Sequence, residues 1–179
     1  MLKQTIQTAA ARKGSLRAYL KRYHYQPDLT RHLDDLPEQP FSQATVNEIV
    51  LWKVNRYVRL PSTVLDALYA LRKLAPKEHR QADRVLTSLL NCNGVDLPMA
   101  STLLRFQNAD VFQIIDRHAY RAVYGDRYPV HSATSASTKR EIYFNYLDAL
   151  RSLARTCRVA FRDLDRILYV FDKDNNGAL

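Results

Sequence analysis

The chain is expected to fold entirely from α-helices. It contains only four glycines among 179 residues, and no run alternates apolar with polar residues as a half-buried strand would. Apolar residues recur instead at helical spacing along most of the sequence. A chain of this length can bury a sizeable core, as one domain or as two small lobes. These observations predict an all-α protein.

The expected elements follow in order. A helix is predicted over residues 3–25, and the three prolines within 26–41 predict a loop or linker there. Ser42 or Thr45 is suited to cap a helix that continues to Tyr57, with a glutamate in its first turn. Further helices are expected over residues 61–75, 77–91, 110–124, 137–156 and 161–171, with a loop over 125–136 before a capped helix.

Composition limits the class of protein. The formal net charge is +9, which fits a polyanionic partner such as nucleic acid, although a basic surface also serves solubility alone. The two cysteines, Cys92 and Cys157, argue against a disulfide framework and cannot supply the four thiolates of an iron–sulfur cluster. No apolar run is long enough to span a bilayer, and no signal peptide is visible. We therefore expect a soluble cytoplasmic or nucleoid-associated monomer with no membrane partner.

The segment 86–124 contains the most specific pattern. An apolar helical stretch stops at a short turn that contains Gly94, and a second helix begins at Leu97. A turn of this kind can present backbone N–H groups to a phosphate. Asp116 follows the apolar pair Ile114–Ile115, where partial desolvation would suit a catalytic carboxylate. The segment therefore offers a phosphate-binding turn and an acid–base candidate close together.

These residues resemble the helix-hairpin-helix DNA glycosylase superfamily (HhH-GPD), whose members excise damaged or modified bases. Gly94-Val95-Asp96 occupies the position of the family's Gly-Val-Gly turn, and Ala100 that of its alanine. Asp116 stands where the family keeps its essential aspartate, followed by His118 and Arg121. The resemblance implies one two-lobed helical domain over 1–179, with the hairpin at about 82–107 and a cleft between the lobes. It also implies duplex DNA containing a modified base as the partner.

Two positions depart from the family pattern. Asp96 replaces the second glycine and brings a negative charge to the turn, unless it points away or caps the next helix. Pro98 occupies the position at which lyase-competent members carry a Schiff-base lysine. The resemblance thus implies a monofunctional enzyme that uses water as nucleophile and needs no cofactor beyond a monovalent cation at the hairpin carbonyls.

Asp116 and Glu48 are the catalytic candidates. A carboxylate beside the sugar stabilises the positive charge that develops as the base leaves, or activates water. The alternative for Asp116 is a helix N-terminal carboxylate paired with Arg117 or Arg121. Glu48 precedes three apolar residues, as does a purine-protonating glutamate of adenine-excising members, but it also fits the first turn of a helix through the helix dipole.

The candidate DNA-binding residues fall into two groups. Trp52 stands among cations and could stack on an extruded base, although a sole tryptophan equally suits core packing. Lys53 is the one nearby amine to consider for a covalent intermediate. The arginines and His118 could contact the DNA backbone or form an ordinary solvated face. The full set is Asn93, Gly94, Val95, Leu97, Trp52, Lys53, Arg56, Arg117, His118 and Arg121.

The C-terminal residues imitate half of a calcium-binding loop. Asp172, Asp174, Asn176 and Gly177 have the spacing of an EF-hand's first ligands, but the closing glutamate and a second helix are missing. We interpret this segment as a helix end followed by a polar tail.

Three functions compete. A DNA N-glycosylase is favoured, with alkylated purine, oxidised guanine and other modified bases all open as substrates, in repair or in defence against foreign DNA. An inactive helix-hairpin-helix DNA-binding protein is the alternative. A helical adaptor for an acidic protein partner is the third.

Overall fold

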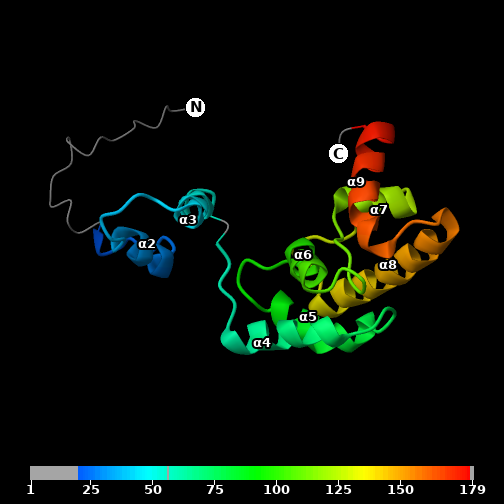
Figure 1. Ribbon diagram of the computed structural model, residues 1–179, viewed down its shortest axis with the longest axis horizontal. Coiled ribbons are helices and arrows are strands. Elements are labelled where there is room, and N and C mark those ends of the chain that lie inside the picture. The colour runs from blue at the N-terminus through cyan, green and yellow to red at the C-terminus, as the bar shows by residue number, and fades with distance from the viewer. Residues whose placement is uncertain (1–19, 56, 178–179) are drawn as a thin grey trace, which may run out of the picture. The chain divides into compact units, whose positions relative to one another are not determined.

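The computed structural model describes residues 20–55 and 57–177. Within these ranges the chain forms eight α-helices and no strand, which confirms the all-α prediction (Figure 1). It divides into two compact units, residues 1–57 and 58–179, which are described separately below. The particular helix-hairpin-helix glycosylase architecture, including its cleft between lobes, stays a prediction.

The first unit contains α2 (Pro27–Asp34) and α3 (Gln43–Lys53). The loop or linker predicted over 26–41 is wrong for residues 27–34, because Pro27 occupies the first helical turn, where its missing N–H costs nothing, and Leu29 is buried. Residues 35–41 are not helical, as predicted. The helix predicted over 3–25 lies mostly outside the described residues, and residues 21–25 are not helical.

The cap predicted for α3 is confirmed. The Ser42 hydroxyl accepts a hydrogen bond from the Thr45 N–H at 3.1 Å. The helix ends at Lys53, short of the predicted Tyr57. Glu48 therefore lies in the middle of α3, so the interpretation of this residue as a first-turn, dipole-stabilised glutamate is wrong.

The second unit contains the hairpin. The elements of this unit are close to those expected, with three short 3-10 turns within the ranges of the predicted helices. In order they are α4 (Ser62–Ala70), η1 (Leu71–Lys73), η2 (His79–Ala82), α5 (Asp83–Leu90), α6 (Leu97–Gln107), α7 (Arg117–Tyr124), α8 (Ala136–Cys157), η3 (Phe161–Asp163) and α9 (Leu164–Asn175).

Helix α8 runs through the core of this unit. The helix is capped as predicted, and the structure identifies the cap as Ser135, whose hydroxyl accepts a hydrogen bond from the Thr138 N–H at 3.1 Å. Tyr143 and Tyr146 are completely buried, and each hydroxyl reaches the loop that precedes α7. Their O–H groups donate to the carbonyls of Gln113 at 3.0 Å and Ile114 at 2.9 Å. These bonds hold the backbone immediately before Asp116.

The helix predicted over 110–124 begins only at Arg117. The loop before it is fixed by α6, because the Ser101 hydroxyl accepts a hydrogen bond from the Ile115 N–H at 3.2 Å. Gln113 is buried and its amide donates to the Ala109 carbonyl at 2.9 Å. Side-chain hydrogen bonds thus replace a helical turn and place Asp116 at the start of α7.

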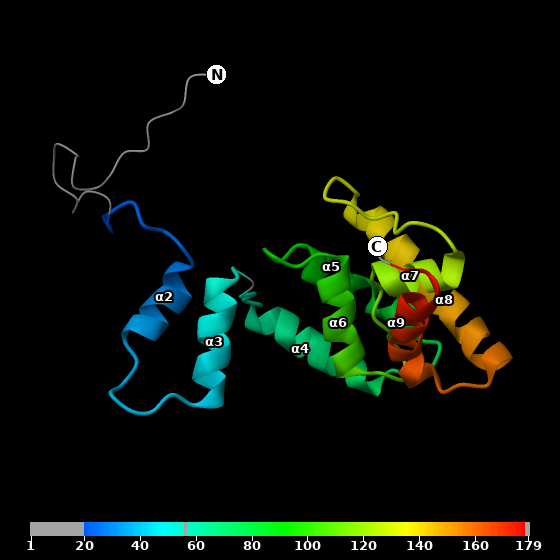
Figure 2. The ribbon, with the colours of Figure 1, turned by 90° about the horizontal axis from the view of Figure 1, so that it is seen from above.

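Helices α7 and α9 lie side by side in two perpendicular views (Figure 1 and Figure 2). Helix α9 continues beyond the predicted Phe171 to Asn175. None of the described helices combines the length and the apolar character needed to cross a bilayer.

Candidate active site

Asp116 is the N-cap of α7. One carboxylate oxygen accepts a hydrogen bond from the Ala119 N–H at 2.7 Å, and no hydrogen bond from a described residue reaches the other oxygen. The side chain is half-buried and lines a pocket of about 260 Å³. The alternative interpretation of Asp116, a carboxylate at a helix N-terminus, is therefore confirmed in its position, but the carboxylate also faces a cavity.

The pocket is lined by residues of α6, α7, α9 and the loop before α7. The lining includes an internal ion pair, in which the Arg105 Nε donates to Asp165 at 3.0 Å. The Asp165 N–H in turn donates to the buried Gln113 side chain at 3.2 Å. With this pair neutralised, Asp116 contributes the negative charge of the lining, and the exposed Arg166 contributes a positive one. The apolar lining consists of Phe106, Ile114, Ala119, Tyr169 and Val170.

The hairpin turn lies between α5 and α6. Gly94 has a φ of +79°, a left-handed conformation that L-residues with a side chain adopt at a cost. Val95 and Leu97 are buried, so their side chains belong to the core, and the Leu97 N–H donates to the Asp96 carboxylate at 2.7 Å. The amides of Asn93, Gly94 and Asp96 donate to no partner in the described part of the chain. Asn93 and Gly94 are exposed, which leaves their N–H groups available to an anion.

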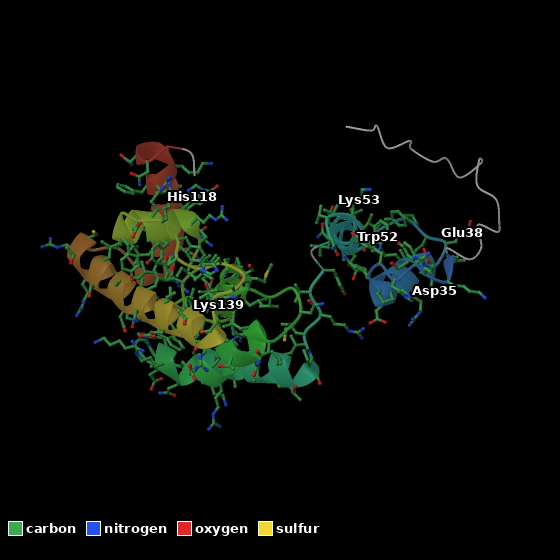
Figure 3. The ribbon with its side chains drawn as sticks, turned by 180° about the vertical axis from the view of Figure 1, so that it is seen from behind. Asp35, Glu38, Trp52, Lys53, His118 and Lys139 are labelled. Carbon is green, nitrogen blue, oxygen red and sulfur yellow. The ribbon has the colours of Figure 1, made fainter. Side chains whose placement is uncertain are left out.

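Asp96 caps α6 and is neutralised by a lysine that the sequence did not indicate. The Lys139 ammonium, from the first turn of α8, lies 2.7 Å from the carboxylate (Figure 3). Burial raises the pKa of Asp96, but the hydrogen bonds from Lys139 and from the Leu97 N–H outweigh it, so the pKa stays below its usual value. The negative charge at the turn is thus compensated. No local signal pointed to Lys139, which lies 43 residues further along the chain than Asp96.

Tyr128 lies in the segment between α7 and α8. Burial raises its pKa well above the usual value, and the nearby charges of Asp96 and Asp116 raise it further. Its hydroxyl is buried and has no hydrogen-bond partner among the described residues. The negative charges of Asp96 and Asp116 thus both act on this tyrosine, which no local sequence pattern indicated.

His118 and Arg121 are directed at Asp172, not at the pocket. The guanidinium donates twice to this completely buried carboxylate, from Nε and from Nη2, each at 2.8 Å. The Nδ1 atom of His118, which lies on α7, is 2.7 Å from the same carboxylate on α9 (Figure 3). These predicted DNA-binding residues thus join two helices, whereas the neighbouring Arg117 is exposed. Asp172, the first residue of the calcium-loop-like pattern, is therefore bonded to His118 and Arg121 of α7.

The predicted residues of the first unit form a separate cluster. The Trp52 indole N–H donates to the Thr30 hydroxyl at 2.9 Å, and the ring packs edge-on against Tyr25 at a centroid distance of 5.2 Å. This packing favours the structural interpretation of the tryptophan. Glu48 lies 3.2 Å from a His32 ring nitrogen.

Lys53 is exposed at the end of α3 (Figure 3). Arg56 lies outside the described residues. Among the residues described, no three or more histidine, cysteine or acidic side chains are grouped to hold a metal ion. The monovalent cation at the hairpin stays a prediction.

Comparison with known proteins identifies no relative. No protein-family model, no curated protein and no solved structure matches the chain. A functional assignment therefore depends on the chemistry of these residues.

Proposed function

We propose that this protein is a monofunctional DNA N-glycosylase. The observation that carries the proposal is the position of Asp116, a half-buried carboxylate that lines a pocket while one of its oxygens is fixed by the Ala119 N–H. A carboxylate held in this way needs no reorganisation to stabilise the positive charge that develops on a sugar. Its second oxygen is available to that charge or to an attacking water.

The hairpin supports DNA as the substrate. Amides at an exposed turn, followed at once by the N-terminus of α6, form the arrangement that binds phosphate without reading sequence. The ion pair between Asp96 and Lys139 removes the charge that would otherwise repel the DNA backbone. The turn and Asp116 belong to the same compact unit, so a duplex bound at the turn would lie against the unit that carries the candidate acid.

The pocket suits a base-sized group. Its volume of about 260 Å³ is below the range of about 300–1,000 Å³ that is usual for drug-sized ligands. An extruded base would meet apolar and aromatic walls, as flipped bases do in enzymes that act on them. Pro98 has no amine to form a Schiff base, so water is the nucleophile and an abasic site is the product.

An inactive DNA-binding protein is the second candidate. The N-cap bond of Asp116 favours it, because a carboxylate at this position stabilises a helix whether or not it acts on a substrate. The phosphate-binding turn would serve both proteins equally. Measurement of base release therefore decides between them.

A screen for base release tests the proposal. Labelled duplexes, each with one alkylated, oxidised or deaminated base, are incubated with the protein and then divided, half receiving hot alkali. At least one duplex should be cut at the modified base only after alkali, because hydrolysis leaves an intact abasic strand. Cutting without alkali would contradict the monofunctional assignment. If the protein bound the duplexes but none was cut, the result would favour the inactive DNA-binding protein.

Gly94→Arg should weaken binding of any duplex by at least about tenfold. The left-handed φ of +79° strains a residue with a side chain, and the strain falls on the turn whose amides are proposed to hold the phosphate. An added Cβ would meet only Val58 at 3.5 Å, an ordinary contact, so the rest of the fold should be kept.

Fluorescence anisotropy at several salt concentrations measures this effect. Wild-type affinity should fall steeply with salt, since phosphate contacts release counterions. Gly125→Arg is the matched control, because Gly125 also has a left-handed φ, of +67°, but lies at the end of α7. Equal losses in the two variants would argue against a specific role for the hairpin.

A further inference from the structure

A second and larger cavity lies in the same unit, apart from Asp116. Its volume is about 620 Å³, and it shares no lining residue with the Asp116 pocket. It is formed by the C-terminal half of α8, the segment around η2 and the start of η3. Its ionisable lining residues are Lys77, His79, Asp148, Arg151, Arg155 and Arg158.

Positive charge dominates this lining. Four cations face one carboxylate, and that carboxylate is shared, since the Arg80 guanidinium also donates to Asp148 at 2.7 Å. Cations at a helix C-terminus can simply compensate the helix dipole, which accounts for the exposed Arg155 and Arg158 at the end of α8. Compensation of the helix dipole does not account for the buried nitrogens of His79 and Arg151 in the same cavity.

Two residues of the cavity have buried nitrogens that form no hydrogen bond with a described residue. His79 is only 3% exposed, yet neither ring nitrogen forms a hydrogen bond with a described residue. Its Nε2 lies 3.1 Å from Asp148, but in a geometry that makes no hydrogen bond. The Arg151 Nε is likewise buried without an acceptor in the described chain, while its Nη2 is tethered to the carbonyls of Asp110 and Val111 at 3.2 and 3.1 Å.

An unpaired buried donor costs about 1–3 kcal/mol, and more if it is charged. A ligand that supplied acceptor oxygens here would recover that cost. Burial lowers the pKa of His79 despite the opposing charge of Asp148, and a neutral imidazole still offers one N–H donor. The Arg151 guanidinium stacks on Phe161 at 4.0 Å, which fixes its plane beside the cavity.

We propose that this cavity binds a small phosphomonoester through its phosphate group. A phosphomonoester carries a charge of about −1.5 to −2 at neutral pH and three strong acceptor oxygens, which match the excess of cations and the unpaired donors. The volume falls within the range of about 300–1,000 Å³ of small-molecule sites, so there is room for a nucleotide and not only for a phosphate ion.

Calorimetric titration of the full chain in chloride buffer tests the assignment, with inorganic phosphate, a nucleoside monophosphate and succinate as probes. Phosphate and the nucleotide should bind at one site, and succinate at least about tenfold more weakly because a dicarboxylate lacks the three clustered oxygens. A duplex without terminal phosphates should not displace the nucleotide. Displacement, equal binding of succinate, or no binding of phosphate would overturn the proposal.

Arg158→Gly gives a variant that should fold well. Arg158 has a left-handed φ of +54°, a conformation that glycine adopts freely at a helix C-terminus, so removing the side chain relieves strain. Nucleotide affinity should fall at least about tenfold through loss of one charge-assisted hydrogen bond. Arg84→Gln, at an exposed position on α5, is the control and should bind as wild type. Unchanged affinity in Arg158→Gly would also contradict the proposal.

Discussion

Asp116→Asn should abolish base release, with a loss of at least about a hundredfold in single-turnover rate, while affinity for the same duplex stays within a few-fold. Asparagine keeps the shape of the side chain but cannot stabilise a developing positive charge or accept a proton from water. Alkali-dependent cleavage measures the rate, and anisotropy on the uncleaved duplex measures the affinity.

The N-cap separates this catalytic effect from a loss of structure. Asparagine caps a helix about as well as aspartate, so the melting temperature of Asp116→Asn should equal that of wild type. Asp116→Ala loses the bond from the Ala119 N–H and should cost about 1 kcal/mol as well as activity. Asp126→Asn, an exposed change just beyond α7, serves as the control and should leave the rate unchanged. Full turnover by Asp116→Asn would remove this residue from the mechanism.

Asp172→Asn should lower the free energy of unfolding by about 3 kcal/mol, the largest stability effect we expect from a single substitution in this unit. The carboxylate is completely buried and accepts hydrogen bonds from Arg121, from His118 at 2.7 Å and from Asn176 at 2.7 Å. An amide cannot balance the guanidinium charge of Arg121, which would lose its carboxylate counterion on α9. Urea unfolding measures the loss. Asp174→Asn, exposed on the same helix, should change stability by less than about 0.5 kcal/mol.

The same carboxylate predicts how stability depends on pH. The hydrogen bonds from Arg121 hold the pKa of Asp172 far below its usual value, against the opposing effect of burial. A depressed folded-state pKa adds stability that is fully present above the unfolded value of about 3.9 and is lost as pH falls below it. Wild-type stability should therefore drop more steeply than that of Asp172→Asn between about pH 5 and pH 2. Parallel curves for the two proteins would show that this ion pair does not control acid unfolding.

The helix termini show how much of the fold was accessible from local sequence. Ser42, one of the two candidates, caps α3, and α8 is capped as expected, by Ser135, because a serine hydroxyl and the N–H three residues later need no other part of the chain. The start of α7 could not be placed in the same way. Residues 110–116 have helical apolar spacing, but Tyr143 and Tyr146 hold the end of that segment in a loop. Their hydroxyls come from a helix about thirty residues away in the sequence.

Some residues of the candidate site were likewise accessible from local sequence, and others were not. The sequence singled out Gly94 and Asp116, and the structure finds the first in a left-handed turn and the second at a helix terminus facing a pocket. It did not show that Lys139 would neutralise Asp96. Nor did it show that His118 and Arg121 would be directed at Asp172 and away from that pocket.

By itself, then, the sequence determined the all-α class, the helix caps and the turn at Gly94. These depend on backbone conformation and on contacts within about four residues. Only the tertiary structure decided which charges meet, which cavity each ionisable group faces and which buried donors have no partner. Those outcomes depend on side chains 43 to 54 residues apart, as in Asp96–Lys139 and His118–Asp172, and they are set by helix packing that no local pattern encodes.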